Sequence, residues 1–367
     1  MSPAKYGNEN MKNKEKRILF LISSLGGGGA ERVACRVASE FSKRYHVFLL
    51  YNEHKSHTYY IDPAVHLLAC LNKNTSVDNK IIRWLFGKYN VLRQLIMVTA
   101  VRNKYNIDTT ISFLRGPNIL NVIAGGKCRK IVSERNDPSC KDERYRKRAL
   151  FVNQRADYVV FQTRRVQEMY PEDVRRKSSV IMNPTEVSCK AAVVKTKKIV
   201  TVGRLHEQKN QKMLLKAFSM YHESHPDYHL YVFGEGELLQ ELLQVAWNYN
   251  IQDFVHFEGF KEDIHAAIAD AEQFVLSSDY EGLPNALMEA MMMGLACIST
   301  ACNGPDVLIT HEKNGLLVPV GDAEALSKAM CCLSDNPGLR ERLGRAAAFT
   351  ALDWTTERVV RLWEKIL

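Results

Sequence analysis

The chain has 367 residues, of which 46% are hydrophobic and 25% charged, enough apolar material for the cores of two domains of ordinary size. This composition excludes a disordered or fibrous protein. The nine cysteines include no C-x-x-C pair, so neither a disulfide framework nor a zinc site is indicated, and a reducing cytosol is the simplest compartment.

Charge is divided unevenly between the two halves of the chain. Residues 1–190 carry 34 Lys and Arg against 17 Asp and Glu, a net of +17, whereas the remaining residues carry 16 against 24, a net of −8. So basic a front half predicts an anionic partner, such as a phosphate-rich membrane surface, a phosphorylated substrate or nucleic acid. The sequence has no zinc finger, aromatic RNA-binding signature or helix-turn-helix pattern, so we do not expect nucleic acid.

Short β-branched or apolar segments alternate with longer segments of helical period, which is typical of βαβ units and parallel sheets. A polar leader precedes Met11, and we interpret the first ten residues as an upstream extension. The apolar segment 18–25 is far shorter than the roughly 20 residues of a membrane span, so it predicts neither a signal peptide nor an anchor. Strands are expected in the first half at residues 17–23, 46–51, 109–113, 130–133, 158–162 and 180–182, with a helix over 30–41.

The same alternation begins again after residues 190–198, which mix small and basic side chains and are interpreted as a linker. Strands are expected in the second half at residues 198–202, 229–233, 255–258, 273–277 and 295–299. We therefore predict an α/β protein with two facing Rossmann-like domains, residues 1–190 and 191–352, each built on a parallel sheet. In such sheets ligands bind outside the carboxyl ends of the strands, so the loops that follow the strands are the candidate sites.

The first of these loops contains four consecutive glycines, of which Gly28 and Gly29 are the candidate contacts. Glycines let the backbone approach a ligand closely and leave amides at a helix start, which favours phosphate. The loop is not a Walker motif, and the dinucleotide pattern G-x-G-x-x-G fails because its sixth position falls on Glu31 or Arg32. A dehydrogenase with Glu53 on the ribose, or a tight turn without a ligand, remain alternatives.

In the second half the corresponding loop is "VGRLHEQKN", in which Gly203 allows a sharp turn and Arg204 and Lys209 could share a diphosphate. Taken alone this is a weak signal, because Arg and Lys in loops are more often simply solvated. "FGEGEL" and "FEGF" follow, with Gly234, Gly236 and Phe260 at the ends of further strands. Glycines at these points let the chain leave the sheet without obstructing the crevice.

The most informative segment is "EGLPNALME", which begins at Glu281 and ends at Glu289. Pro284 suits the first turn of a helix and Gly294 the residue just beyond its end, so a helix over 284–293 is predicted. The amides of its first turn form an anion site. The flanking carboxylates would repel phosphate but accept hydrogen bonds from hydroxyls, which indicates a nucleotide-sugar site.

"GRLHEQKN", "FGEGEL", "EGF" and "SSDYEGLPNALMEAMMMGLACIST" together resemble the donor-binding domain of family-4 retaining glycosyltransferases, which have the two-Rossmann GT-B fold. "ADYVVFQT" and "VIMNP" are similar to late strands of that family's first domain. "DWTTERVVRLWEKIL", at about 353–367, resembles its final helix, which crosses back onto the first domain. The resemblance thins between about residues 53 and 130.

The resemblance implies metal-independent glycosyl transfer with retained anomeric configuration. It implies that Glu281 contacts hydroxyls of the transferred sugar, that Glu289 contacts ribose, and that Arg204 and Lys209 hold the diphosphate and stabilise the leaving group. We therefore take Arg204, Lys209 and Glu281 as catalytic. The expected donor-binding residues are Gly28, Gly29, Gly203, Gly234, Gly236, Phe260, Gly282, Leu283, Pro284, Asn285, Ala286, Leu287 and Glu289. No D-x-D sequence is present, which argues against a metal on the diphosphate, and no cofactor is expected besides the donor, for which UDP carrying a hexose or N-acetylhexosamine is the choice.

The acceptor side depends on weaker signals. "SERNDP" follows a strand, and Glu134, Arg135 and Asn136 are acceptor candidates. Residues 80–96 put Ile81, Leu85, Tyr89, Leu92 and Ile96 on one helical face with basic side chains beside it. This pattern fits a helix in a membrane interface and equally a helix that covers the sheet. The basic excess favours a lipid-linked or glycan acceptor at an anionic membrane surface, with the protein peripheral on the inner face of the cell membrane, as in relatives that build cell-surface polysaccharides.

Three rival functions stay open at this point. They are a nucleotide-sugar epimerase of the same fold, an NAD-binding Rossmann dehydrogenase and, for the basic half, a nucleic-acid-binding protein. The epimerase differs in forming product without an acceptor.

Overall fold

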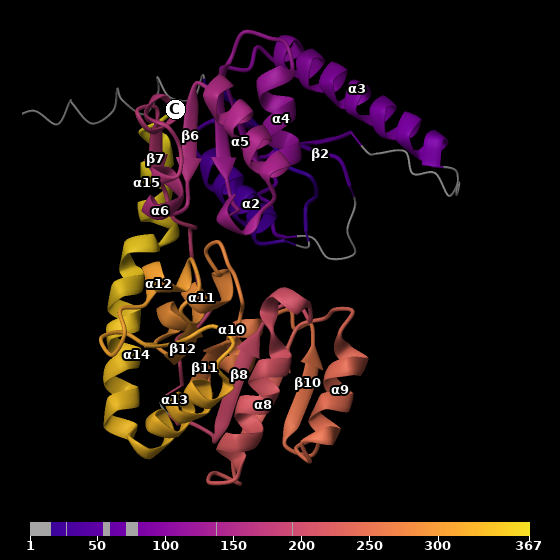
Figure 1. Ribbon diagram of the computed structural model, residues 1–367. Coiled ribbons are helices and arrows are strands. Elements are labelled where there is room, and N and C mark those ends of the chain that lie inside the picture. Colours follow the sequence, from indigo (N-terminus) through magenta and orange to yellow (C-terminus); the bar gives the residue numbers. More distant parts are fainter. Residues whose placement is uncertain (1–15, 27, 54–58, 71–79, 137, 193) are drawn as a thin grey trace, which may run out of the picture. The chain divides into compact units, whose positions relative to one another are not determined.

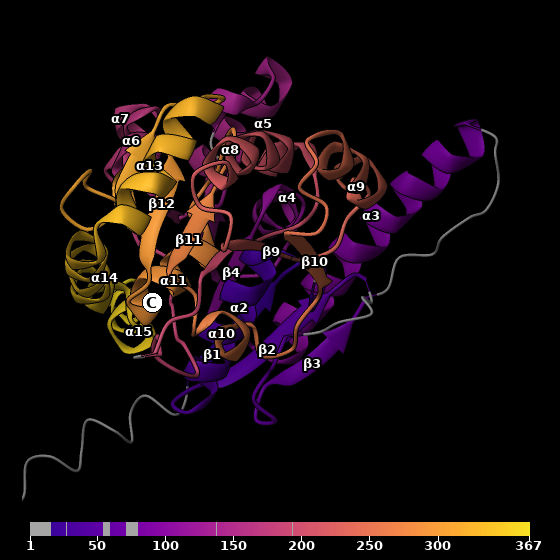
Figure 2. The same ribbon diagram turned by 90° about the horizontal axis from the view of Figure 1, so that it is seen from below.

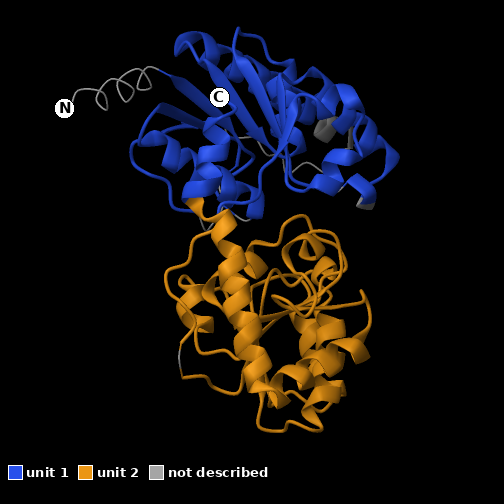
Figure 3. Ribbon diagram, turned by 90° about the vertical axis from the view of Figure 1, so that its left-hand side faces the viewer, with its two compact units in different colours: residues 1–184, 357–367 blue, residues 185–356 orange. Residues whose placement is uncertain are grey.

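The computed structural model describes residues 16–26, 28–53, 59–70, 80–136, 138–192 and 194–367. The chain divides into two compact units, residues 1–184 with 357–367 (unit 1) and residues 185–356 (unit 2) (Figure 3). Unit 1 contains a seven-stranded sheet and unit 2 a six-stranded sheet, and all the strand pairs are parallel. The predicted pair of Rossmann-like domains with the GT-B fold is confirmed.

Unit 1 has the strand order β3-β2-β1-β4-β5-β6-β7 (Figures 1 and 2). Its strands are β1 (Arg17–Leu21), β2 (His46–Tyr51), β3 (His66–Ala69), β4 (Thr109–Phe113), β5 (Arg129–Glu134), β6 (Tyr158–Phe161) and β7 (Ser178–Val180). Its helices are α2 (Gly29–Ser42), α3 (Lys80–Lys104), α4 (Arg115–Ile123), α5 (Glu143–Arg155), α6 (Arg164–Glu168) and α7 (Glu172–Arg175), with a 3-10 turn η2 (Pro138–Cys140).

The central strands of this sheet are buried on both faces because helices cover both sides. Every residue of β4 is buried, and β1 is buried after its first residue. β1 lies between β2 and β4, so the strand order reverses there. The loops after β1 and β4 therefore flank the switch point at which doubly wound sheets bind ligands.

Unit 2 has the strand order β10-β9-β8-β11-β12-β13. Its strands are β8 (Lys198–Val202), β9 (His229–Phe233), β10 (Val255–Gly259), β11 (Gln273–Leu276), β12 (Ala296–Thr300) and β13 (Leu316–Val318). Its helices are α8 (Gln211–His222), α9 (Leu239–Asn248), α10 (Ile264–Ile268), α11 (Asn285–Met293), α12 (Pro305–Leu308), α13 (Ala323–Asp335) and α14 (Pro337–Ala351), with 3-10 turns η3 (Glu207–Lys209) and η4 (Leu352–Trp354). A single buried cluster joins the sheet to α8, α9, α13 and α14.

The last helix, α15 (Thr356–Glu364), packs on unit 1, as predicted for the end of the chain. The Trp363 side chain is fully buried, and its ring centroid lies 5.6 Å from that of Phe113 in β4. Arg44, just after α2, donates to Glu364 at 2.7 Å. The end of the chain, separated in sequence from the rest of unit 1 by the whole of unit 2, thus completes the core of unit 1.

The structure confirms the predicted strands of both halves to within two or three residues at their ends. Two strands were missed, β3 and β13, which lie at the edges of their sheets. β3 has four residues with a mostly exposed pattern and β13 has three, so neither has the long apolar run of a buried parallel strand. Within the described residues, no helix is both long enough and apolar enough to cross a bilayer.

Candidate active site

Residues 277–284 connect β11 to α11 at the carboxyl edge of the second sheet, so the motif 281–289 covers the end of this loop and the first five residues of the helix. β11 is fully buried, and Pro284 is the N-cap of α11, with an extended backbone and no capping side chain. Gly294 ends the helix with a φ of 90°, a conformation that favours glycine. The helix predicted over 284–293 is thus confirmed to within one residue.

This segment lies at the switch point of the second sheet. β8 and β11 are adjacent there, although β9 and β10 lie between them in sequence. Hydrogen bonds tie the loop after β8 to the loop after β11: Asp279 N to Gln208 O at 2.9 Å, Ser277 Oγ to Lys209 O at 2.8 Å, Gln208 Nε2 to Tyr280 O at 2.8 Å and Asn210 Nδ2 to Asp279 Oδ1 at 2.7 Å. These hydrogen bonds hold the two predicted donor loops together at the place where ligands bind in such sheets.

Glu281 and Lys209, both predicted site residues, form an ion pair across these loops. The distance from Lys209 Nζ to Glu281 Oε1 is 2.5 Å, and the side chains are 20% and 7% exposed. Glu281 Oε1 also accepts from Ser278 Oγ at 2.6 Å, and Oε2 accepts from Gln208 Nε2 at 3.4 Å. A buried carboxylate needs such partners, and they fix both charges at the carboxyl edge of the sheet.

Glu289 lies one turn into α11, and only 5% of it is exposed. Its Oε2 lies 3.4 Å from Nε2 of His265, a residue at the start of α10. The two glutamates of the motif thus occupy different surroundings, one beside an ammonium and the other beside an imidazole.

The remaining motif residues form the turn between the two acids. Leu283, Pro284 and Leu287 are buried, so their side chains anchor the turn. Gly282, Asn285 and Ala286 are partly exposed. The first turn of α11 carries no acidic side chain, so its positive end is suited to an anion.

The three glycines predicted at strand ends have a steric reason. A Cβ on Gly234, which has a φ of 128°, would lie 2.1 Å from the carbonyl oxygen of Gly203, and a Cβ on Gly236 would lie 2.1 Å from that of Leu205. Gly203 itself packs against the stem of Lys209, whose Cε would lie 3.3 Å from an added Cβ. These glycines allow the loops after β8 and β9 to touch backbone to backbone, which sets the position of Lys209.

Arg204 and Phe260 have exposed side chains, 53% in the case of Phe260. Both follow strands of the second sheet, Arg204 two residues after β8 and Phe260 directly after β10. Arg204 also accepts a hydrogen bond at its backbone oxygen from Gln211 Nε2 at 3.0 Å. Its loop is therefore fixed while its guanidinium stays accessible.

A third loop, unpredicted from the sequence, supports the turn that carries Glu281. Gly304 follows β12 and has a φ of 98°, and a Cβ there would lie 1.6 Å from the carbonyl oxygen of Gly282. Nearby, burial raises the pKa of the Cys302 thiol to about 12, so this cysteine stays protonated and is no nucleophile. A glycine shortly after a strand was the available signal for this loop.

In unit 1, Gly28 and Gly29 lie where the glycine loop enters α2, next to the first sheet's switch point; residue 27 lies outside the described residues. Gly28 is the N-cap, and a Cβ there would lie 2.3 Å from Oε2 of Glu31. The carboxylate of Glu31, in the first turn of α2, therefore lies close to the backbone of Gly28.

Glu134 and Arg135, the acceptor candidates at the end of β5, are buried, and Asn136 is partly exposed. Glu134 Oε1 accepts from Tyr145 Oη at 2.9 Å and from the Asn136 amide at 3.2 Å, and burial raises the pKa of this carboxyl. Asn136 Nδ2 also donates to Tyr145 Oη, at 3.1 Å.

Arg135 is 6% exposed and donates through Nη1 to Asn183 Oδ1 at 2.7 Å. Its guanidinium lies 4.9 Å from the ring centroid of Phe113 and 5.9 Å from that of Trp363, while Nε and Nη2 have no hydrogen-bond partner among the residues that the structure describes. Burial lowers its pKa to about 9. Arg135 thus helps to hold α15 on the first sheet.

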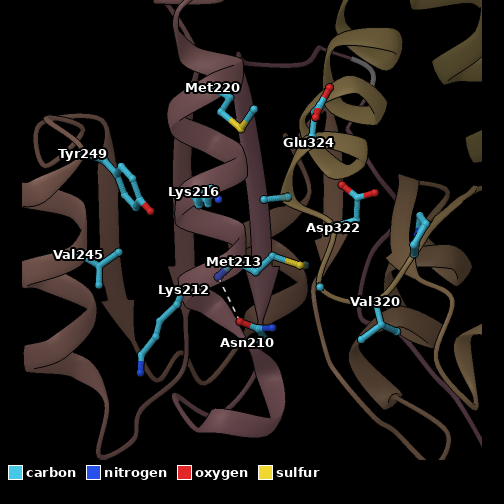
Figure 4. A pocket seen from close by; sticks show the side chains of 13 residues that line it. Asn210, Lys212, Met213, Lys216, Met220, Val245, Tyr249, Val320, Asp322 and Glu324 are labelled. Carbon is cyan, nitrogen blue, oxygen red and sulfur yellow. Dashed lines mark hydrogen bonds between the residues drawn. The ribbon is translucent and has the colours of Figure 1, made fainter.

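The cavity in Figure 4, of about 940 Å³, lies elsewhere in unit 2. Lys212, Lys216 and Met220 of α8 line one side of it and Asp322 and Glu324 the other. None of the predicted donor-site residues lines this cavity. The candidate site is therefore the pair of loops at the β8–β11 switch point.

Residues 186–349 match the sequence profile of the family described as "Glycosyl transferases group 1". This match covers unit 2, with both loops of the switch point and both glutamates.

Two curated relatives from Campylobacter jejuni match nearly the whole chain. One is "N-acetylgalactosamine-N,N'-diacetylbacillosaminyl-diphospho-undecaprenol 4-alpha-N-acetylgalactosaminyltransferase", 25% identical over 94% of this chain and 98% of the relative. The other is "GalNAc-alpha-(1->4)-GalNAc-alpha-(1->3)-diNAcBac-PP-undecaprenol alpha-1,4-N-acetyl-D-galactosaminyltransferase", 26% identical over 96% and 98%.

Among solved structures, HepE of Anabaena "in complex with UDP and glucose" superposes with a TM-score of 0.79 at 16% identity, covering 96% of this chain and 99% of that one. This likeness establishes the fold. The family match assigns residues 186–349, which contain both glutamates, to the group 1 glycosyl transferases, glycosyltransferase family 4, whose members are retaining, metal-independent enzymes.

Proposed function

We propose that this enzyme transfers a hexose or N-acetylhexosamine from a UDP-sugar to a lipid-linked saccharide or glycan in cell-surface polysaccharide biosynthesis. The observation that carries the proposal is the arrangement at the β8–β11 switch point. There, two buried carboxylates, Glu281 and Glu289, flank a helix start that has no acidic residue in its first turn. A diphosphate between two hydroxyl-bearing groups matches this order of charges.

The roles follow from what each side chain offers. Glu281 accepts hydrogen bonds from hydroxyls of the transferred sugar and Glu289 from ribose hydroxyls. The other donor-binding residues that we propose in unit 2 are Gly203, Gly234, Gly236, Phe260, Gly282, Leu283, Pro284, Asn285, Ala286 and Leu287. In unit 1 the proposed donor-binding residues are Gly28 and Gly29. Negative charge develops on the nucleoside diphosphate as the glycosidic bond breaks, and Lys209, Arg204 and the α11 amides stabilise it.

The ion pair between Lys209 and Glu281 supports a catalytic part for both residues. Because the ammonium already lies 2.5 Å from the carboxylate, it is fixed before the donor arrives and does not have to be ordered during the reaction. The same contact neutralises Glu281, which would otherwise repel the diphosphate.

For the acceptor we propose a lipid-linked saccharide, with Glu134, Arg135 and Asn136 at its end of the site. The names of the two Campylobacter relatives, which contain diphospho-undecaprenol or PP-undecaprenol, support this class. Glu134 and Arg135 are buried, so they act by shaping the loop after β5, and Asn136 is the most accessible of the three.

An anionic membrane surface is the proposed location of the enzyme, on the inner face of the cell membrane. Tyr89, Leu92 and Ile96 of α3 are 46%, 57% and 61% exposed, and Ile123 at the end of α4 is 51% exposed. A hollow of about 390 Å³ between these helices is lined mainly by apolar residues. The side chains of residues 80–85, which include the predicted Ile81 and Leu85, lie outside the described residues. Exposed apolar residues on a strongly basic half of the chain are complementary to an anionic bilayer.

The donor assignment is tested by thermal unfolding with a panel of nucleotide sugars, because a ligand that binds only the folded state raises the midpoint. UDP-hexoses or UDP-N-acetylhexosamines should raise it most, and Glu281→Gln and Glu289→Gln should abolish most of the shift. Glu341→Gln is the matched control, since that exposed carboxylate pairs with Arg345 on the surface. A shift with NAD but not with UDP-sugars would refute the proposal.

The proposed acceptor and the proposed membrane surface are tested by separate experiments. Product formed only when a polyprenyl-diphosphate saccharide is added, with the donor's anomeric configuration retained in the NMR spectrum, supports a retaining transferase. An epimerase would form product without an acceptor.

Leu92→Ser with Ile96→Ser should release the protein from anionic liposomes, whereas Phe349→Ser, which changes a 77% exposed residue of α14, should not.

A further inference from the structure

His265 is a buried residue that the proposed roles above leave unused. It lies near the start of α10 and is 8% exposed. Its imidazole lies between Ser188 on one side and Glu289 on the other. Buried polar groups are normally hydrogen-bonded, so a buried imidazole beside the proposed ribose-binding carboxylate indicates that the ring interacts with it.

The contact with Ser188 fixes which nitrogen carries the proton. Nδ1 of His265 accepts from the Ser188 backbone N–H at 3.1 Å, a group that can only donate. The Ser188 hydroxyl donates to Asp263 Oδ1 at 3.0 Å. Nδ1 is therefore unprotonated, and in the neutral ring the proton is on Nε2.

Nε2 lies 3.4 Å from Oε2 of Glu289, and the two side chains are only 10% and 6% exposed. No hydrogen bond to Nε2 forms within the described part of the chain. A buried N–H donor that faces a carboxylate from slightly beyond ideal hydrogen-bond length needs only a small movement to close on it.

The ring is held from the other side by the segment that enters unit 2. Besides Ser188, this segment contacts the end of α11: Lys190 Nζ donates to Met292 O at 2.9 Å, and the Ala191 amide donates to Met293 O at 2.9 Å. The segment is thus tied to both α10 and the helix that carries Glu289. The imidazole cannot leave the carboxylate without breaking its bond to this backbone.

We propose that His265 is a positioning residue that acts through Glu289. Its Nε2–H takes one carboxylate oxygen, which helps to fix the plane of the carboxylate that we propose to accept hydrogen bonds from ribose hydroxyls. This inference rests on the proposed contact between Glu289 and ribose. His265 affects how tightly the nucleotide binds, and it leaves the bond-breaking step to Lys209, Arg204 and Glu281.

Two substitutions separate the two nitrogens of the ring. His265→Gln puts an amide N–H near the place of Nε2, whereas His265→Asn can place its amide oxygen near the place of Nδ1 but is too short to reach that of Nε2. The matched control is His311→Asn, because His311 Nδ1 likewise accepts a backbone amide, that of Leu317 at 3.0 Å, but its ring is half exposed.

The measurement is calorimetric binding of UDP and of 2′,3′-dideoxy-UDP to each variant of the full chain, with donor KM and kcat for the same set. Losing a hydrogen bond to a charged group should weaken UDP binding about tenfold in His265→Asn, with KM rising and kcat nearly unchanged. His265→Gln should recover most of the affinity, and the dideoxy nucleotide should bind all variants equally. The ratio of the two nucleotides is internal to each variant, so a folding defect does not disturb it.

Adding Glu289→Gln distinguishes the possible failures. If Glu289→Gln alone leaves UDP binding unchanged, the proposed ribose contact is wrong and the inference falls with it. If Glu289→Gln weakens binding but His265→Asn behaves like His311→Asn, or the effects of the double variant simply add, the ribose contact stands and the positioning role is refuted. A double variant no weaker than Glu289→Gln alone supports it.

Discussion

Gly304→Ala is the perturbation that most directly tests how the turn carrying Glu281 is held. Gly304 has a φ of 98°, and an added Cβ would lie 1.6 Å from the carbonyl oxygen of Gly282. Gly321→Ala is the matched control, because Gly321 also has a positive φ, 79°, and a Cβ there meets nothing within 4 Å.

The structure separates two contributions to the expected effect. Both variants place alanine at a positive φ, which costs about 1–2 kcal/mol in the left-handed region and at least as much at Gly304, where ψ is −65°. Only Gly304→Ala adds a collision, and relieving it to an ordinary contact of ~3.5 Å requires the two loops to separate by roughly 2 Å. A displacement of ~1 Å at a substrate-positioning group can reduce turnover about 100-fold.

We therefore expect Gly321→Ala to lower the free energy of unfolding by about 1–2 kcal/mol and to leave kcat/KM unchanged. Gly304→Ala should be less stable than this control and should lose about 100-fold in kcat/KM. Urea unfolding gives the stability difference, and transfer from the nucleotide sugar that stabilises the protein most gives the activity. Equal stability losses and equal activities in the two variants would refute the claim that the loop after β12 fixes the Glu281 turn.

Three further predictions concern other contacts. Lys209→Met should lower the free energy of unfolding more than Glu281→Gln does, because it leaves Glu281, the less exposed partner, charged and unpaired. The loss should lie towards the lower end of the ~3–5 kcal/mol that breaking a buried ion pair costs. Equal losses for the two variants in chemical denaturation would contradict this. Trp363→Ala should cost about 3–5 kcal/mol in the unfolding of unit 1, whereas Leu362→Ala, at a 39% exposed position, should cost far less; similar midpoints would argue against the packing of α15. Burial lowers the pKa of Lys195 to about 8 from 10.5 in the unfolded chain. The unfolded chain therefore binds more protons between those values, the stability contributed by Lys195 rises with pH across that window, and Lys195→Met should remove the rise, as urea midpoints at several pH values would show.

The sequence predicted the elements in which a strong apolar run is bounded by a glycine or a proline. β8, β9 and α11 were predicted in this way, because each apolar stretch ends in glycine or begins at proline. β3 and β13 were missed because short edge strands are partly solvated and lack that contrast. The final helix was predicted from resemblance, and its fully buried Trp363 shows why unit 1 depends on it.

The candidate site shows the same division. The residue types and their spacing made Glu281, Glu289 and Lys209 candidates, but Lys209 and Glu281 lie 72 positions apart, so their ion pair is visible only in the fold. His265 and Gly304 carry no motif of their own. Their importance comes from neighbours brought to them by α10, α11 and the loop after β12.

Burial also changes the interpretation of the acceptor candidates in unit 1. Glu134 and Arg135 follow a strand and carry charge, which made them candidates for contact with an acceptor. In the fold one is covered by Tyr145 and the other lies against Phe113 and Trp363. Sequence cannot separate a charged residue that faces a crevice from one that is covered, because both occur directly after a buried strand.

The central claim is that a sugar nucleotide is bound with its pyrophosphate at Lys209, Arg204 and the start of α11, and with its two hydroxyl-bearing ends at Glu281 and Glu289. The most direct test is a crystal structure with the nucleotide sugar that gives the largest thermal shift. We predict the Glu281 carboxylate within about 3 Å of a sugar hydroxyl and the Glu289 carboxylate within the same distance of a ribose hydroxyl. A donor bound elsewhere, with both carboxylates making no contact to its hydroxyls, would contradict the account.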